Sequence, residues 1–177
     1  MNLKNFLLIL PLTAFALKIS SPVFDNGGLI PVTYTCDGEN ISPPLKFSDI
    51  PKNTKSLVLI MHDPDAPMGD FTHWVVYKIP PTVKGFPRDL PKKAVLEQGI
   101  EQGLNDFGFV GYGGPCPPPW DKAHRYIFEL YALDYVPDLK PGAKREEVEK
   151  ALKGHVIEKA TLTGKYKRVT PFMFGRR

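Results

Sequence analysis

The chain contains 177 residues, of which 42% are hydrophobic and 24% are charged, and its formal net charge is +4 at pH 7. Since a domain usually has about 100–200 residues, the length and apolar content predict one domain with a hydrophobic core. The charge excess is too small to favour nucleic-acid binding, which requires clustered cations. Nineteen prolines predict short elements joined by stiff loops, because proline breaks helices and central strands.

The first sixteen residues differ from the rest. Lys4 precedes an apolar run, residues 6–16, that ends in Ala-Phe-Ala. The run is too short for a membrane span, which needs about 20 residues. A positive charge, an apolar run and small residues in this order predict a secretory signal peptide that is cleaved after Ala16. The alternatives are a buried N-terminal element or an extension from a wrongly chosen start codon. With cleavage, residues 17–177 form a single secreted or extracytoplasmic domain; without it, the protein is cytoplasmic. No later segment could span a membrane.

Six segments carry strand patterns. Leu29–Thr35 alternates apolar and polar residues, which is the two-residue period of a half-buried strand. Ser56–Met61 and His73–Ile79 are continuous apolar or aromatic runs, as expected of central strands covered on both faces. The other three predicted strands are Phe107–Tyr112, Tyr126–Leu133 and Ala160–Tyr166.

One segment has helical spacing. In Arg145–Lys153, Val148 and Leu152 are four residues apart, acidic residues occupy the first turn, and Gly154 can end the helix. The sequence therefore predicts a mainly β fold of antiparallel sheets with one or two short helices.

The two cysteines, Cys36 and Cys116, are 80 residues apart and lie beside loop residues. Their spacing excludes zinc-finger and thioredoxin motifs. In an exported protein they could form a disulfide that closes a long loop. Two separate, half-buried thiols are the alternative.

Three of the four histidines fall in two segments about fifty residues apart. The first runs from His62 to Pro67 and is followed by His73; the second joins Gly111–Pro119 to His124. Each combines a loop stiffened by proline or glycine with an apolar strand-like run, which is how a rigid scaffold presents polar groups at the edge of a sheet. The two segments therefore predict a small preformed pocket.

The chemistry of these segments suits an anion. The second segment contains three glycines, at which backbone N–H groups can approach an oxyanion: Gly111, Gly113 and Gly114. Protonated histidine at position 73 or 124 would add positive charge. Asp63 would repel a fully ionised phosphate, so we expect it to orient a histidine or to accept a proton from the ligand. The predicted site favours protonated or weakly charged anions, although ordinary turns contain the same residue types.

Two other interpretations use the same residues. A metal site could be drawn from two histidines and a carboxylate among His62, Asp63, His73 and His124, but no His-x-His or His-x₃-His spacing supports it. Cys116 could be a nucleophile activated by His124. Its two proline neighbours, and the lack of a helix N-terminus that would lower the thiol pKa, argue against that role. We therefore expect no metal, no cofactor and no enzymatic activity.

Six segments form one composite pattern: Lys18–Pro22, Tyr34–Leu45, Asp63–Pro67, His73-Trp74, Gly111–Pro118 and His124–Tyr126. Together they resemble the motifs of the phosphatidylethanolamine-binding protein family, in the bacterial and archaeal branch described as Raf-kinase-inhibitor-like. The resemblance covers nearly the whole chain from Lys18 onward. It implies a β-sandwich of two antiparallel sheets flanked by short helices.

The resemblance also implies a small pocket at one end, which takes phosphate, acetate-like anions or phospholipid headgroups. Carried over position by position, its ligand-binding residues are Asp63, Ala66, Pro67, His73, Gly111, Gly113, Pro115, His124 and Tyr126. Which proline of 115–119 lines the pocket is left open, because this branch has a longer loop. Family members are non-enzymatic binders, so the expected partner is a small anion or a phospholipid headgroup.

Some members of the family inhibit serine proteases or carboxypeptidases. The resemblance therefore also allows a secreted inhibitor that presents the rigid loop Gly114–Trp120 to an enzyme cleft, and a homodimer is compatible with either role. The chain departs from the family pattern at Trp120–Ala123, where a glycine-rich stretch is expected. We expect a bulkier and more charged pocket rim there.

Overall fold

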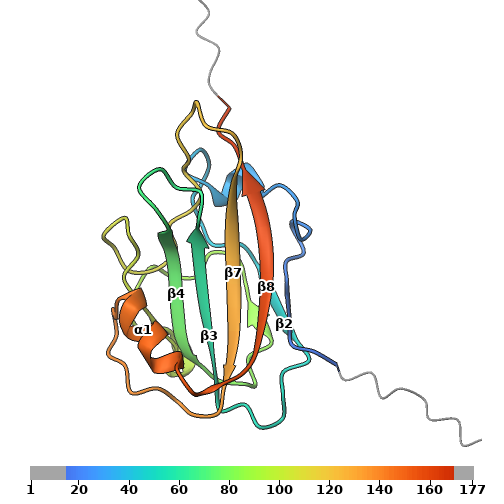
Figure 1. The fold of residues 1–177 in the computed structure, drawn as a ribbon, viewed down its shortest axis with the longest axis vertical. Coiled ribbons are helices and arrows are strands. Elements are labelled where there is room, and N and C mark those ends of the chain that lie inside the picture. Colours follow the sequence, from blue (N-terminus) through green and yellow to red (C-terminus); the bar gives the residue numbers. More distant parts are fainter. Residues whose placement is uncertain (1–14, 170–177) are drawn as a thin grey trace, which may run out of the picture.

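The computed structural model describes residues 15–169, which form a β-sandwich of two antiparallel sheets (Figure 1). The larger sheet has the strand order β6-β4-β3-β7-β8 and the smaller sheet the order β1-β2-β5. The strands are β1 (Lys18–Ser20), β2 (Leu45–Ser48), β3 (Ser56–Asp63), β4 (Phe71–Ile79), β5 (Gly85–Phe86), β6 (Glu101–Gln102), β7 (His124–Leu133) and β8 (Val156–Tyr166). Within these residues the helices are α1 (Arg145–Leu152) and two 3-10 turns, Val32–Tyr34 and Glu97–Gly99. The predicted fold class is confirmed.

The four long strands lie where the sequence predicts them. Predicted strands 56–61, 73–79, 126–133 and 160–166 are parts of β3, β4, β7 and β8. β3 is central, because it pairs with β4 on one side and β7 on the other, and all eight of its residues are buried. Burial on both faces explains why its sequence is continuously apolar instead of alternating.

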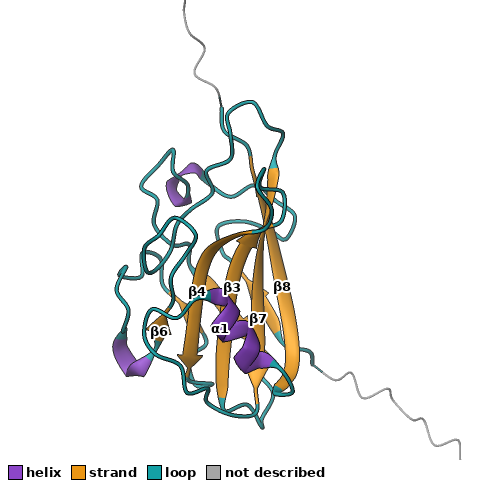
Figure 2. Cartoon of the chain, turned by 60° about the vertical axis from the view of Figure 1, so that its left-hand side comes forward, coloured by secondary structure: helices purple, strands orange, loops and turns teal. Residues whose placement is uncertain are grey.

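β3 separates two hydrophobic cores. Leu59 and Met61 face the core between the two sheets, whereas Ile60 belongs to a second cluster with Val148 and Leu152 of α1. Figure 2 shows α1 lying across the outer face of the larger sheet. The two apolar residues that predicted this helix are thus the ones that attach it to the sheet, and the prediction is confirmed.

The predicted strand at 29–35 is wrong. Leu29 forms an isolated bridge with β8, but Val32–Tyr34 turns into a 3-10 helix. Ile30 and Tyr34 are buried, but Val32 between them is 53% exposed and Thr35 is buried, so the burial does not alternate as in a strand. A single helical turn between two buried anchors produces the same apolar spacing as a short strand, and the period cannot distinguish them.

The predicted strand at 107–112 is also wrong, because a turn reverses the chain there. The side-chain Oδ1 of Asn105 accepts hydrogen bonds from the backbone N–H groups of Phe107 (3.0 Å) and Phe109 (3.3 Å). Gly108 lies between them with φ of 92°, a backbone conformation that favours glycine. Local bonds from an Asn side chain therefore replace a strand ladder in this segment.

Among residues 15–169, no helix has the length and apolar character needed to cross a membrane. The predicted signal peptide, residues 1–16, lies almost wholly outside the described residues. Its cleavage, the extracytoplasmic location and the homodimer therefore stay predictions.

Candidate functional site

Three strand ends meet at one end of the larger sheet, the upper end in Figure 1. β3 ends at Asp63, β4 begins at Phe71 and β7 begins at His124. The guanidinium of Arg125 donates hydrogen bonds of 3.0 and 2.9 Å to the carboxylate of Asp65, and its backbone N–H donates a third of 2.9 Å. These bonds lower the pKa of Asp65 to about 2. The loop after β3 is thus fixed against the start of β7.

A β-bulge turns His73 toward these strand ends. In the pairing of β3 with β4, Met61 lies opposite Trp74 and His62 opposite Thr72, which leaves His73 without a partner. Trp74 lies in the core between the sheets, so strict alternation would point His73 to the outer face. Because the bulge adds one residue to β4, His73 instead faces the same side as Trp74.

A small cavity of about 110 Å³ lies between the strand ends. It is lined by Asp63, Ala66, Phe71, His73, Phe107, Cys116, Pro117, His124 and Tyr126. Five of the predicted residues are in this lining, namely Asp63, Ala66, His73, His124 and Tyr126. The lining does not include Pro67, Gly111, Gly113 or Pro115. Among the prolines of 115–119, the structure places Pro117 in the wall.

Two aromatic residues of the cavity wall, Phe71 and Phe107, were not predicted. The ring centroid of Phe107 lies 4.8 Å from that of Phe71 and 5.3 Å from that of His73, in edge-on contacts. Tyr126 packs edge-on against His73 at 5.2 Å. Phe71 precedes His73 by two residues, and that spacing could have placed both on one face of a strand. Phe107 gave no such signal, since a loop carries it.

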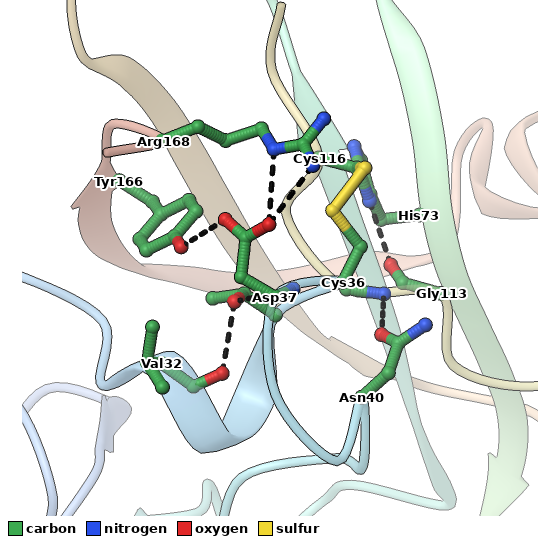
Figure 3. The surroundings of a disulfide bond; sticks show 11 residues. Val32, Cys36, Asp37, Asn40, His73, Gly113, Cys116, Tyr166 and Arg168 are labelled. Carbon is green, nitrogen blue, oxygen red and sulfur yellow. Dashed lines mark hydrogen bonds and ion pairs between the residues drawn. A yellow bond between two sulfur atoms is a disulfide. The ribbon is translucent and has the colours of Figure 1, made fainter. Parts of the chain in front are cut away.

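His73 offers the cavity an acceptor and not a cation. Its Nδ1 donates to the carbonyl oxygen of Gly113 over 2.6 Å, because a carbonyl can only accept. Burial lowers the pKa of His73 and outweighs the opposing effects of the hydrogen bond to Gly113 and of the charge of Asp63. The neutral imidazole keeps an unprotonated Nε2, which Figure 3 shows on the side of the ring away from Gly113.

His124 carries the positive charge of the site. Its Nδ1 lies 2.7 Å from Oδ2 of Asp63 and its Nε2 lies 2.9 Å from Oδ2 of Asp121. An imidazole donates at both nitrogens only when it is protonated. Burial alone would lower the pKa of His124, but the hydrogen bonds to the two carboxylates outweigh burial and raise it. Asp63 also accepts a bond of 2.8 Å from the backbone N–H of Asp65, so the carboxylate that orients His124 is itself fixed.

Tyr126 supplies a neutral donor. Burial raises the pKa of its hydroxyl, and the nearby charge of Asp63 adds to the shift. The phenol therefore keeps its proton at physiological pH and can donate it to an acceptor in the cavity.

The glycines do not form the predicted backbone cradle. The backbone N–H groups of the three glycines already donate to acceptors in the protein; these are Gly111, Gly113 and Gly114. Gly114 donates to Oδ1 of Asn40 over 2.8 Å. A Cβ atom at Gly114 would overlap this oxygen and the carbonyl of Tyr34. Glycine is needed there for close packing of two chain segments, and the proposed role as an oxyanion donor is wrong.

His62 lies apart from the cavity. It follows Ile60 on the outer face of β3, where its Nδ1 lies 2.6 Å from Asp70 and its Nε2 lies 3.3 Å from Glu129. In the part of the chain that the structure describes, no group of three or more His, Cys, Asp or Glu side chains could hold a metal ion. His62 therefore cannot share a metal ion with the residues of the cavity.

Cys36 and Cys116 are joined in a disulfide beside the cavity (Figure 3). Their Cα atoms are 5.4 Å apart, and Cys116 lines the cavity. Asp37, the next residue after Cys36, accepts hydrogen bonds from the hydroxyl of Tyr166 and from the guanidinium of Arg168. The turn that carries Cys36 is thus anchored to the end of β8. A bonded Cys116 has no thiolate, so the Cys–His nucleophile interpretation is wrong.

The contributions of His124 and His62 to the free energy of unfolding should fall as the pH rises above about 6.5, whereas that of His73, whose pKa is lowered, rises with pH below that value. A histidine whose folded pKa is raised stabilises the fold fully below its unfolded pKa, about 6.5, and loses that contribution as the pH passes its folded pKa. For His62, burial lowers the pKa, but the contacts with Glu129 and Asp70 outweigh burial and raise it, so its contribution has the same sign. Urea unfolding of the wild type and of His124→Gln at several pH values separates the contribution of His124 from that of His62. The variant should show a shallower decline, and parallel curves would contradict the raised pKa of His124.

Fold and site together define a β-sandwich protein with a small polar cavity at one end of its larger sheet. The family model described as "Phosphatidylethanolamine-binding protein" matches residues 20–167. A UPF0098 protein from Pyrococcus horikoshii is 52% identical over 155 residues, which are 86% of this chain and 77% of that protein. The chain belongs to the phosphatidylethanolamine-binding protein family.

Solved structures of the family have the same fold. A homologue from Chlamydia trachomatis matches with a TM-score of 0.78 and 43% identity, over 86% of this chain and 98% of that one. YbcL from E. coli, described as a member of the mammalian family, matches with a TM-score of 0.79 and 34% identity, over 87% and 99%.

Proposed function

We propose that the protein is a non-enzymatic binder of singly charged phosphate-type anions that keep a proton, taken either as free phosphate or as a phosphate monoester such as the phosphoethanolamine headgroup of a phospholipid in its free form. The observation that carries this proposal is the pairing of two unlike histidines in one cavity of about 110 Å³. His124 is cationic, whereas His73 is neutral and presents an acceptor. A singly charged anion with at least one hydroxyl matches both, because the hydroxyl can donate to His73 while the charge faces His124.

The remaining polar groups point to the same ligand class. The hydroxyl of Tyr126 is a donor for an oxyanion, and Asp63 adds a fixed negative charge beside it. A doubly charged anion without a proton would be repelled by Asp63, and it could not donate a hydrogen bond to the lone pair on Nε2 of His73. The site therefore favours dihydrogen phosphate, or a phosphate ester that retains a proton, over sulfate of nearly the same shape.

Titration calorimetry near pH 6 tests this proposal. Phosphate and phosphoethanolamine should bind the wild type, and sulfate should bind at least about tenfold more weakly, a difference of about 1.4 kcal/mol. Binding of phosphoethanolamine alone would identify the headgroup as the source. His124→Gln should lose most of the affinity, while His155→Gln, at an exposed histidine paired with Asp134 outside the pocket, should retain it. Equal binding by wild type and His124→Gln would exclude the pocket.

A second function, protease inhibition by the loop Gly114–Trp120, is supported by the exposure of Trp120. This side chain is 82% exposed, and the disulfide at Cys116 fixes the loop that carries it. A rigid loop with a protruding aromatic residue loses little entropy when it enters an enzyme cleft. Assays against serine proteases and carboxypeptidases should then show inhibition that Trp120→Ala removes, and no inhibition at micromolar protein would exclude this role.

A further inference from the structure

Asp121 occupies the nitrogen of His124 that an anion would use. Of the two ring nitrogens, Nδ1 is held by Asp63, whose side chain is 5% exposed, and Nε2 is held by Asp121, whose side chain is 30% exposed. Asp63 ends a central strand, whereas Asp121 lies on the loop before β7. The two carboxylates are therefore unequal partners: Asp63 is fixed, and Asp121 can leave without opening a buried hole.

The surroundings of Asp121 suit such a movement. Asp121 and His124 line a second, open cavity of about 760 Å³, whose wall also contains Lys122 and Lys165. Within residues 15–169, neither lysine has an ion-pair partner. A displaced carboxylate would remain beside two cations, and an arriving anion would meet the same cations. His124 forms part of the wall of both the large and the small cavity, so it lies between them.

We propose that Asp121 is a built-in competitor, whose carboxylate holds Nε2 of His124 while the pocket is empty and must be displaced by the incoming anion. This proposal rests on the anion-binding function above and names the residue that sets its affinity and selectivity. An external carboxylate such as acetate can form only the ion pair with Nε2 of His124 that Asp121 already forms. Because Asp121 belongs to the same chain, its effective concentration is high, and acetate does not displace it. A protonated phosphate gains two further bonds, with His73 and Tyr126. Asp121 thus excludes simple carboxylates and admits phosphate.

Removal of the competitor should reverse this selectivity. In titrations near pH 6, Asp121→Ala should bind phosphate about tenfold more tightly than the wild type. Acetate should bind Asp121→Ala, compete there with phosphate, and shift the His124 ring resonances, whereas it should leave the wild type unchanged. Asp121→Asn, which keeps the shape of the side chain, should show the same trends to a smaller extent.

The matched control is Asp65→Asn, which removes the same charge from the same open cavity without touching His124. An equal gain of phosphate affinity in Asp65→Asn would show that the loss of any negative charge from the open cavity has this effect, and it would overturn the proposal. So would phosphate affinity in Asp121→Ala that is equal to or weaker than in the wild type. If phosphate binds none of the proteins, the proposed function fails, and acetate binding to Asp121→Ala alone still decides whether Asp121 is a competitor.

Discussion

Replacement of both cysteines by alanine should lower the free energy of unfolding by about 4 to 5 kcal/mol. Cys36 and Cys116 are separated by 80 residues, and the chain-entropy model assigns this cost to the loop that the bond closes in the unfolded chain. Nearby hydrogen bonds between the two segments remain in the variant, such as that from the backbone N–H of Cys36 to the carbonyl of Pro115 (3.0 Å). The fold should therefore persist with reduced stability.

Urea unfolding measures this effect, with a reductant as the matched control. The wild type in reductant should lose the same stability as Cys36→Ala/Cys116→Ala, and the double variant should not respond to reductant. A loss below about 1 kcal/mol would show that the bond constrains little in the unfolded chain. A mass spectrum of the unreduced protein without the loss of two hydrogens would show that the bond is not formed.

Asp63→Ala should cost about 3 to 5 kcal/mol of stability and abolish phosphate binding, because it leaves the charge of buried His124 without its best partner. Asp63→Asn should cost less, since the amide oxygen still accepts the bond from Nδ1. The cost should also depend on pH. In the wild type, Asp63 raises the pKa of His124 and stabilises the protonated imidazole. The loss of Asp63 therefore costs most at low pH, where His124 is protonated in both the folded and the unfolded state.

Urea unfolding of Asp63→Ala at about pH 5.5 and about pH 8.5 tests this reasoning. The difference from the wild type should shrink at the higher pH. A difference that stays constant or grows would mean that Asp63 stabilises the fold by packing, and that its charge does not act through His124.

Two of the strands that carry the site, β3 and β4, could be predicted from the sequence because they are buried on both faces. Such a strand has a continuous apolar run, which only a buried strand or a buried helix produces, and the short lengths of β3 and β4 favour strands. The strand predicted at 29–35 was wrong because an alternating pattern of apolar residues does not specify a strand. Its apolar residues alternate in the sequence, but the 3-10 turn buries Ile30 and Tyr34 and leaves Val32 exposed.

The candidate site was only partly predictable. Asp63, His73 and His124 could be named from residue type, motif and resemblance, yet the side of the sheet that His73 faces depends on a bulge that leaves no mark in the sequence. The contact between Asp121 and His124 could not be predicted in detail either, because it depends on how one loop folds back. The sequence did indicate that Trp120–Ala123 is unusual, which is where that contact arises.

An NMR titration of the histidine side chains with phosphate near pH 6 tests the anion pocket most directly. The chain has four histidines, and they occupy three different settings: His73 and His124 line the cavity, His62 lies on the outer face of β3, and His155 pairs with Asp134 near the start of β8. Phosphate should shift the ring resonances of His73 and His124 with one common dissociation constant and leave those of His62 and His155 unchanged. Shifts at His62 or His155 alone, or no shift at any histidine, would contradict an anion site at the ends of β3, β4 and β7.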